Sequence, residues 1–114
     1  MEKEIDSSLL DSKGVKLSSL IEYNEGSIVS KTLINKKSGT VTFFAFDTGE
    51  GLSGHKAPYD ALVFIIEGEM FISIENDNCT VKSGNIILLP ANKMHALKAN
   101  AKTKMLLIMI KENA

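Results

Sequence analysis

The sequence predicts an all-β domain, either a sandwich or a closed barrel. Short segments rich in Ile, Val, Thr, Leu and Phe recur along the chain, and turn residues separate them about every 8–12 residues. No long helical pattern competes with this rhythm. The chain has 114 residues, which is about the length of one domain with its own core. We therefore expect one domain over residues 1–114, with an N-terminal arm (1–20) and a barrel (21–114).

The N-terminal arm is rich in Lys, Asp and Ser and has few apolar side chains. A short helical turn is expected around Ile5 and Leu9, ending at Gly14. Residues 15–19 then suit a first edge strand. An arm of this composition often packs only when a partner covers it.

The barrel strands are expected where β-favouring residues lie between turn residues. They cover residues 27–35, 40–46, 62–66, 70–75, 79–82, 85–89, 95–99 and 104–111. The strand over residues 40–46 is apolar on both faces, so both faces should be covered. Residues 47–54 contain three glycines and are expected to form a loop.

Composition excludes several kinds of partner. The formal net charge of −1 creates no field that would attract nucleic acid or an anionic membrane. No apolar run reaches the roughly 18–20 residues that span a membrane, and the charged start lacks the apolar middle of a secretory signal. The single cysteine, Cys79, cannot form an internal disulfide, which suits a reducing compartment. We expect a cytoplasmic protein without nucleic-acid or membrane partners.

The first of the two histidines lies between two glycines, in the segment GEGLSGHKAPYDALVFIIEG. This segment resembles the first motif of the cupin superfamily, in which a glycine and five residues precede His-x-His, and a glutamate and a closing glycine follow. Gly49, His55 and Gly68 match the motif. Ala57 stands at its second histidine, and Ala61 stands at its glutamate.

The second histidine lies in GNIILLPANKMHALKA, which resembles the second cupin motif. That motif has a glycine, five residues, Pro-x-Gly, two residues, His, three residues and Asn. Gly84, Pro90 and His95 match, whereas Asn92 replaces the second glycine and Ala99 the final asparagine. The two resemblances together imply a cupin double-stranded β-helix, a jelly-roll barrel.

The resemblance also implies a site inside the barrel. In the family, three histidines and the glutamate of the motifs bind one metal ion, and here only His55 and His95 carry donor atoms. Residues of like parity on a strand share a face, so several neighbours should line a pocket with the histidines. The expected pocket residues are His55, Ala57, Tyr59, Ala61, Val63, His95, Leu97 and Ala99. Apolar walls with a few polar groups suit a small organic ligand.

A metal site remains the alternative, with an Fe, Mn, Ni or Zn ion as cofactor. Two histidines alone hold a divalent ion weakly, because catalytic sites usually have three protein ligands. Asp60 is the nearest carboxylate, and a bulge at Pro58 would turn it inward. Glu50, Tyr59 and Met94 are weaker candidates for the third ligand.

Three functions follow from these observations. The preferred one is a binding or sensing module, a barrel that binds a small organic molecule and has a reduced or absent metal site. The alternative is a metal-dependent oxygenase or isomerase that uses His55, His95 and a non-standard third ligand. The third is a metal-free enzyme with a histidine as general base, although no partnering acid is evident.

Two further expectations concern the ligand and the assembly. All 13 basic residues are lysines, and phosphate clamps favour arginine, so a nucleotide sugar is disfavoured. Small proteins that this chain resembles pair as dimers, and exposed β edges invite such pairing. We therefore expect a homodimer and a small-molecule ligand, whose identity the sequence does not specify.

Overall fold

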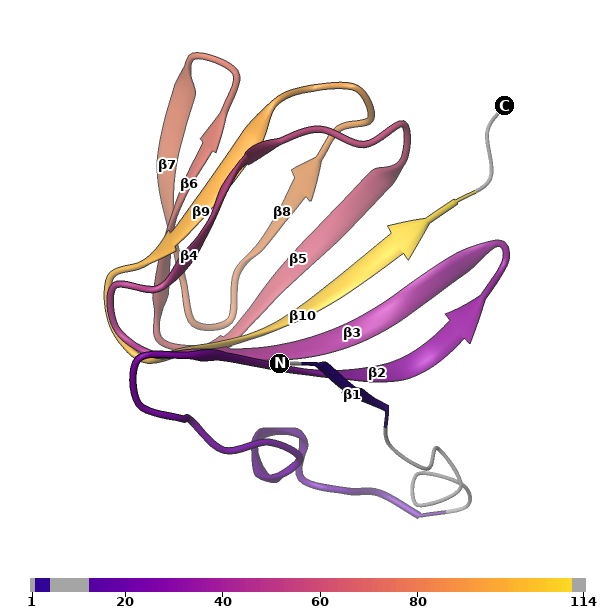
Figure 1. Ribbon diagram of the computed structural model, residues 1–114, viewed down its shortest axis with the longest axis vertical. Helices are drawn as coiled ribbons and strands as arrows, with labels where there is room; N and C mark the ends of the chain where they lie inside the picture. Colours follow the sequence, from indigo (N-terminus) through magenta and orange to yellow (C-terminus); the bar gives the residue numbers. More distant parts are fainter. Residues whose placement is uncertain (1, 5–12, 112–114) are drawn as a thin grey trace.

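The computed structural model, which describes residues 2–4 and 13–111, folds into two β-sheets that meet along one side and splay apart on the other (Figure 1). The larger sheet has the order β1 (Glu2–Glu4), β2 (Ile28–Lys36), β3 (Gly39–Phe46), β10 (Thr103–Ile110), β5 (Asp60–Glu67) and β8 (Ile86–Leu89). The smaller sheet has the order β4 (Gly51–His55), β9 (His95–Ala99), β6 (Glu69–Ile74) and β7 (Asp77–Lys82).

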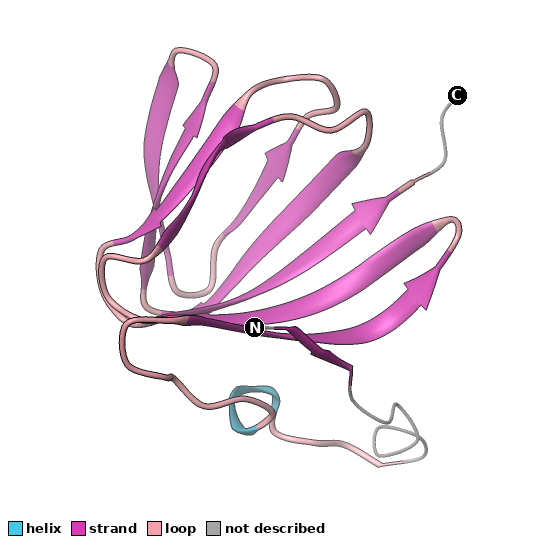
Figure 2. Ribbon diagram, viewed as in Figure 1, coloured by secondary structure: helices cyan, strands magenta, loops and turns pink. Residues whose placement is uncertain are grey.

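Almost every described residue in regular structure is in a strand, which confirms the expected all-β class (Figure 2). The one helical element in these residues is a 3-10 turn, η2 (Leu17–Ser19). It is far too short to cross a membrane, and no other helix is found in the part of the chain described. Strands distant in sequence pair side by side, as β3 does with β10 and β4 with β9. This crossed order is typical of a jelly-roll barrel.

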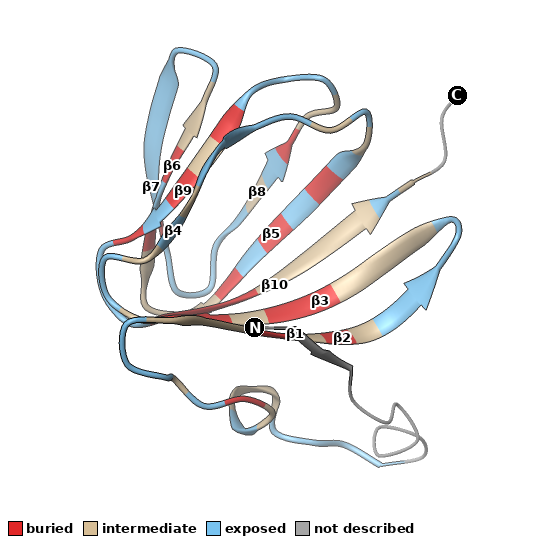
Figure 3. Ribbon diagram, viewed as in Figure 1, coloured by how far each residue is buried: buried red, intermediate tan, exposed pale blue. Residues whose placement is uncertain are grey.

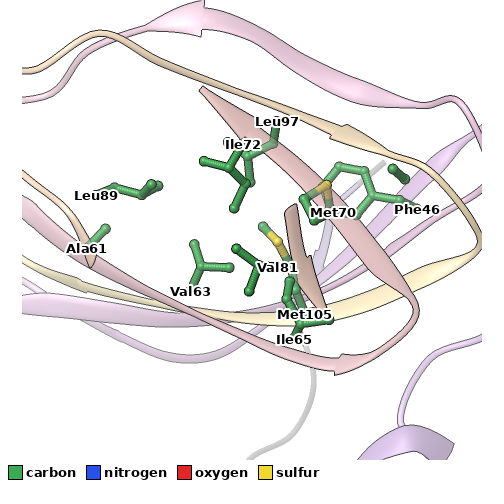
Figure 4. Packing of buried hydrophobic residues seen from close by; sticks show 11 residues of the cluster. Phe46, Ala61, Val63, Ile65, Met70, Ile72, Val81, Leu89, Leu97 and Met105 are labelled. Atoms are coloured by element: carbon green, nitrogen blue, oxygen red, sulfur yellow. The ribbon is translucent and has the colours of Figure 1, made fainter. Parts of the chain in front are cut away.

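Apolar side chains from both sheets fill the space between them (Figure 4). On β5 the buried and exposed residues alternate, because successive side chains of a strand point to opposite faces (Figure 3). The buried members of this inner cluster are Phe46, Ala61, Val63, Ile65, Met70, Ile72, Val81, Leu89, Leu97, Ala99 and Met105.

A second cluster lies on the outer face of the larger sheet. Phe43 and Ala45 of β3 point outward and are buried together with Ile21, which directly follows the arm. Leu17 and Leu20 pack against the same cluster. Both faces of β3 are therefore covered, as its apolar sequence predicts, and the arm packs on its own chain.

Charged side chains hold the arm in this position. The Nζ atom of Lys104 donates a hydrogen bond to the carbonyl of Ser18 at 2.6 Å, and that of Lys31 donates to the carbonyl of Leu20 at 2.7 Å. The edge strand expected at residues 15–19 is wrong, because this segment contains the 3-10 turn η2. The helical turn expected around Ile5 and Leu9 lies outside the described residues.

The loop expected at residues 47–54 is also wrong in part, since β4 begins at Gly51. A Cβ atom at this position would overlap the carbonyl oxygen of Leu97 on β9. The glycine therefore allows two strands to approach closely, and it does not mark a loop. Gly68 forms the turn between β5 and β6, where its φ of 92° lies in the left-handed region that glycine adopts without strain.

Candidate functional site

The pairing of β4 with β9 brings the two histidines together. His55 is the last residue of β4, His95 is the first residue of β9, and the two are register partners. Their Nε2 atoms lie 3.1 Å apart, and the rings meet edge to face, with centroids separated by 4.3 Å and an interplanar angle of 69°. Two residues 40 positions apart in sequence thus form one site.

A bulge in β4 aims His55 at this site. Leu52 pairs with Leu97 and His55 pairs with His95, so β4 has one more residue than β9 between these two pairs. In a regular strand Leu52 and His55 would lie on opposite faces, because the side-chain period is two. The extra residue places both on the cavity side.

Hydrogen-bond partners constrain the protons of the pair. The Nδ1 atom of His55 lies 2.9 Å from the carbonyl oxygen of Ser53, and that of His95 lies 3.2 Å from the carbonyl oxygen of Lys93. A carbonyl only accepts, so each Nδ1 needs a proton, and the contact between the Nε2 atoms needs a third. Two neutral imidazoles carry only two protons. A singly protonated pair therefore satisfies all three contacts, and a neutral pair leaves one unsatisfied.

The surroundings of the two rings differ. His95 is 8% exposed, whereas His55 is exposed to solvent. Burial lowers the pKa of His95, and the nearby His55 lowers it further, against the opposing effect of the Lys93 carbonyl. The buried ring and the exposed ring thus place the contact between the two Nε2 atoms at the boundary between the interior and solvent.

The two rings form one wall of a cavity of about 70 Å³. The lining residues are Leu52, His55, Ala57, Tyr59, Ala61, Leu89, His95, Leu97, Met105, Leu107 and Met109. Carbon and sulfur make up most of this surface. Because a cavity of about 150 Å³ holds benzene, this one holds a group of only a few heavy atoms.

Six of the eight expected pocket residues line this cavity: His55, Ala57, Tyr59, Ala61, His95 and Leu97. Val63 and Ala99 do not line it and are buried in the inner cluster instead. Sequence reasoning missed the wall formed by β10. The alternation of Met105, Leu107 and Met109 in the sequence was the signal that could have found it.

Asp60 does not complete a metal site. Its Oδ1 atom accepts a hydrogen bond from the backbone N–H of Ala91 at 2.9 Å, and the side chain is exposed, outside the lining of the cavity. No group of three His, Cys, Asp or Glu side chains is placed to hold a metal within residues 2–4 and 13–111. Ala57 and Ala61 line the cavity with methyl groups. The donor set therefore does not fit the metal ion that the cupin resemblance implies.

The loops that carry the motifs are joined beside the cavity. The backbone N–H of Asn92 donates to the carbonyl of Ala57 at 2.7 Å, which links the β8–β9 loop to the β4–β5 loop. Asn92 has a φ of 64°, where the second motif has a glycine. Asparagine is among the few other residues that adopt this left-handed conformation readily. The substitution thus keeps the loop geometry.

Two crossed β-sheets with a histidine pair beside an interior cavity define a small double-stranded β-helix barrel. A family model of the cupin domain matches residues 42–111, so the chain belongs to the cupin family. None of the curated proteins matches this chain in sequence.

Solved structures support the same assignment. A conserved protein of unknown function from Streptococcus pyogenes is 31% identical, with 90% of each chain covered and a TM-score of 0.86. A cupin superfamily protein from Desulfitobacterium hafniense is 28% identical, with 89% of this chain and 93% of that chain covered and a TM-score of 0.85. A Cupin 2 conserved barrel domain protein from Leptotrichia buccalis is 43% identical over 82% of this chain but only 46% of its own, with a TM-score of 0.80.

Proposed function

We propose that this barrel binds a small organic molecule in the cavity beside His55 and His95, without the metal ion used elsewhere in the family. The observation that carries the proposal is the cavity itself: an apolar hollow with two imidazoles on one wall. Ligand sites commonly combine such walls with a few polar groups that fix orientation. The methyl groups of Ala57 and Ala61 leave space where metal ligands would otherwise stand.

The histidine pair suits a ligand that forms hydrogen bonds. His55 is exposed and His95 is buried, so the pair reaches from solvent into the cavity. A polar group of the ligand can replace the contact between the two Nε2 atoms, while an apolar group of a few heavy atoms fills the cavity. Burying that group contributes about 0.8 kcal/mol for each CH₂.

Thermal shift measurements on a panel of sugars, amino acids and organic acids test this proposal. A ligand at one hundred times its dissociation constant should stabilise the fold by about 2.7 kcal/mol. The variant Ala57→Leu narrows the cavity and should lose the response, whereas Cys79→Ser, an exposed change on β7, should keep it. The absence of any response across the panel would contradict the proposal.

The alternative is a metal-dependent oxygenase or isomerase with a non-standard third ligand. The convergence of two Nε2 atoms on one point is the feature that favours it. Elemental analysis of untagged protein after reconstitution with Fe, Mn, Ni and Zn separates the two functions. Less than about a tenth of an equivalent supports the metal-free barrel, and about one equivalent that His95→Ala abolishes supports the enzyme.

A further inference from the structure

A second, polar hollow adjoins the histidine cavity. It has a volume of about 340 Å³ and is lined by Thr32, Asn35, Thr40, Thr42, Leu107, Met109 and Lys111. Leu107 and Met109 also line the histidine cavity, so the two hollows share a wall on β10. We call the second hollow the threonine groove.

Strand register shows how the two hollows form one surface. Thr42 on β3 pairs with Leu107 on β10, and Thr40 pairs with Met109. Met109 in turn pairs with Ala61 on β5, which lines the histidine cavity. Along this row of the inner face the side chains change from hydroxyls to hydrocarbon. The change takes place within one sheet, with no element between the two hollows.

A bulge in β2 keeps the groove polar. The register shifts between Thr32, which pairs with Thr42, and Ile34, which pairs with Val41. Ile34 is therefore turned outward and is 48% exposed, while Asn35 pairs with Thr40 and lines the groove. The bulge thus places the exposed Asn35 at the rim of the groove and keeps Ile34 out of it.

Three polar side chains of the groove have unused hydrogen-bonding capacity. Within the described part of the chain, the side chains of Asn35, Thr40 and Thr42 form no hydrogen bond, although Thr42 is only 8% exposed. No buried side-chain oxygen or nitrogen of the described residues lacks a partner, so these three groups are open to solvent or to a ligand. Lys111 adds a positive charge, and no acidic side chain lines the groove. This chemistry favours an anion that also carries hydroxyl groups.

We infer that the ligand is an elongated amphipathic hydroxy acid, with its apolar end in the histidine cavity and its hydroxyl and carboxylate groups in the threonine groove. This inference rests on the proposed ligand-binding function. Because neighbouring strands are about 4.8 Å apart, a molecule that reaches from β10 to β2 is about 10 Å long. The ligand hydroxyl forms hydrogen bonds with Thr40, Thr42 or Asn35, and the carboxylate pairs with the Lys111 ammonium.

Calorimetric titration with 3-hydroxyoctanoate, octanoate, 3-hydroxybutyrate and the methyl ester of 3-hydroxyoctanoate tests the inference. The first compound should bind most tightly, because each of the others lacks the hydroxyl, the apolar end or the charge. Thr42→Val removes one hydroxyl at nearly constant shape and should weaken binding about threefold to tenfold. Lys111→Met should remove the preference for the acid over its ester.

Matched controls separate this inference from the proposed function. Thr80→Val on β7 and Lys98→Met on β9 change the same residue types at exposed positions of the other sheet and should leave binding unchanged. If Ala57→Leu abolishes binding but Thr42→Val and Lys111→Met do not affect it, the cavity binds ligand and the groove assignment is wrong. If the groove variants weaken binding and Ala57→Leu does not, the two hollows are separate sites, which also overturns the inference.

Failure of all four compounds would contradict the hydroxy-acid assignment. The wider panel of sugars, amino acids and organic acids then decides the proposed function independently. A response there that Ala57→Leu removes would preserve the function and exclude this ligand class.

Discussion

The Nε2 atom of His55 lies 3.1 Å from the Nε2 atom of His95, across directly paired positions of β4 and β9. Each ring also faces a backbone carbonyl through Nδ1. Both rings are thus held by hydrogen-bond partners while they line the cavity. Its members differ in burial, so one ring faces solvent and the other the interior.

The lowered pKa of His95 predicts a loss of stability in mild acid. Below the ordinary value of 6.5 the unfolded chain binds a proton that the folded His95 still resists. Stability linked to this group is complete above that value and is lost as the pH falls through the lower pKa of the folded state. Urea midpoints measured from about pH 7.5 to about pH 5 should show this slope. The urea midpoint should depend less strongly on pH in His95→Gln than in the wild type. The same pH dependence in both proteins would contradict the prediction.

Restoring the missing donors should create a metal site. Ala57→His together with Ala61→Glu places a histidine and a carboxylate beside the existing pair, at positions that line the cavity. We expect metal uptake to rise from below about a tenth of an equivalent to about one, because three or four protein ligands suffice for tight binding. Leu62→Glu is the matched control, since this neighbour points outward. If the double variant and the control take up equal amounts of metal, the missing side-chain donors at positions 57 and 61 are not what prevents metal binding.

The Tyr23 hydroxyl should help to hold the segment between the arm and β2 against the larger sheet. It donates a hydrogen bond to the Oε2 atom of Glu67 at 2.6 Å, and Lys104 lies over its ring with Nζ 4.9 Å from the centroid. Tyr23→Phe should lower the free energy of unfolding by about 1.5 kcal/mol, as expected for a hydrogen bond to a charged group. Tyr59→Phe, at the cavity, is the control and should cost less.

The same tyrosine makes stability sensitive to alkali. Burial and the Glu67 carboxylate raise the pKa of Tyr23 well above its ordinary value of 10.0. The folded state thus keeps a proton that the unfolded chain loses, so this contribution is complete below that pH and declines above it. Denaturant titrations at neutral and strongly alkaline pH should show the decline in the wild type and not in Tyr23→Phe.

The homodimer expected from the sequence stays a prediction, and the structure offers a surface for it. The cross-strand pairs Leu62–Leu88 and Phe64–Ile86 are exposed and lie on the outer face of β5 and β8. The second hydrophobic cluster, formed by Ile21, Phe43 and Ala45, covers β3 and β10 but includes none of these four side chains. β8 is the edge of its sheet, so antiparallel pairing of two copies would join these side chains about a twofold axis.

Sedimentation tests this assembly. The wild type should sediment as a dimer at micromolar concentration, and Ile86→Lys should convert it to a monomer, because the charge would be buried in the contact. Ile34→Lys is the matched control, because it makes the same change at an exposed position of β2, and it should leave the dimer intact. A monomeric wild type would contradict the prediction.

Most strands were predictable because their signals are local. Alternating apolar residues and turn glycines define each barrel strand without knowledge of its partner, and each of the eight expected barrel strands has a counterpart in the structure, unlike the edge strand expected at residues 15–19. Two strands were missed: β1, and β4, which is short and glycine-rich. The Gly51 of β4 is required by the close approach of β9 rather than by β4 itself. Nothing near Gly51 in the sequence reveals that requirement.

The sequence by itself determined the family resemblance, the positions of the two histidines and the loss of donors at Ala57 and Ala61. Only the tertiary structure decided which side chains meet there. The bulges that turn His55 and Asn35 inward depend on how β4 and β2 pair with strands that are distant in sequence. One extra residue in a strand moves each following side chain to the opposite face of the sheet. For the same reason the wall from β10 and its polar continuation emerged only once the strands were paired.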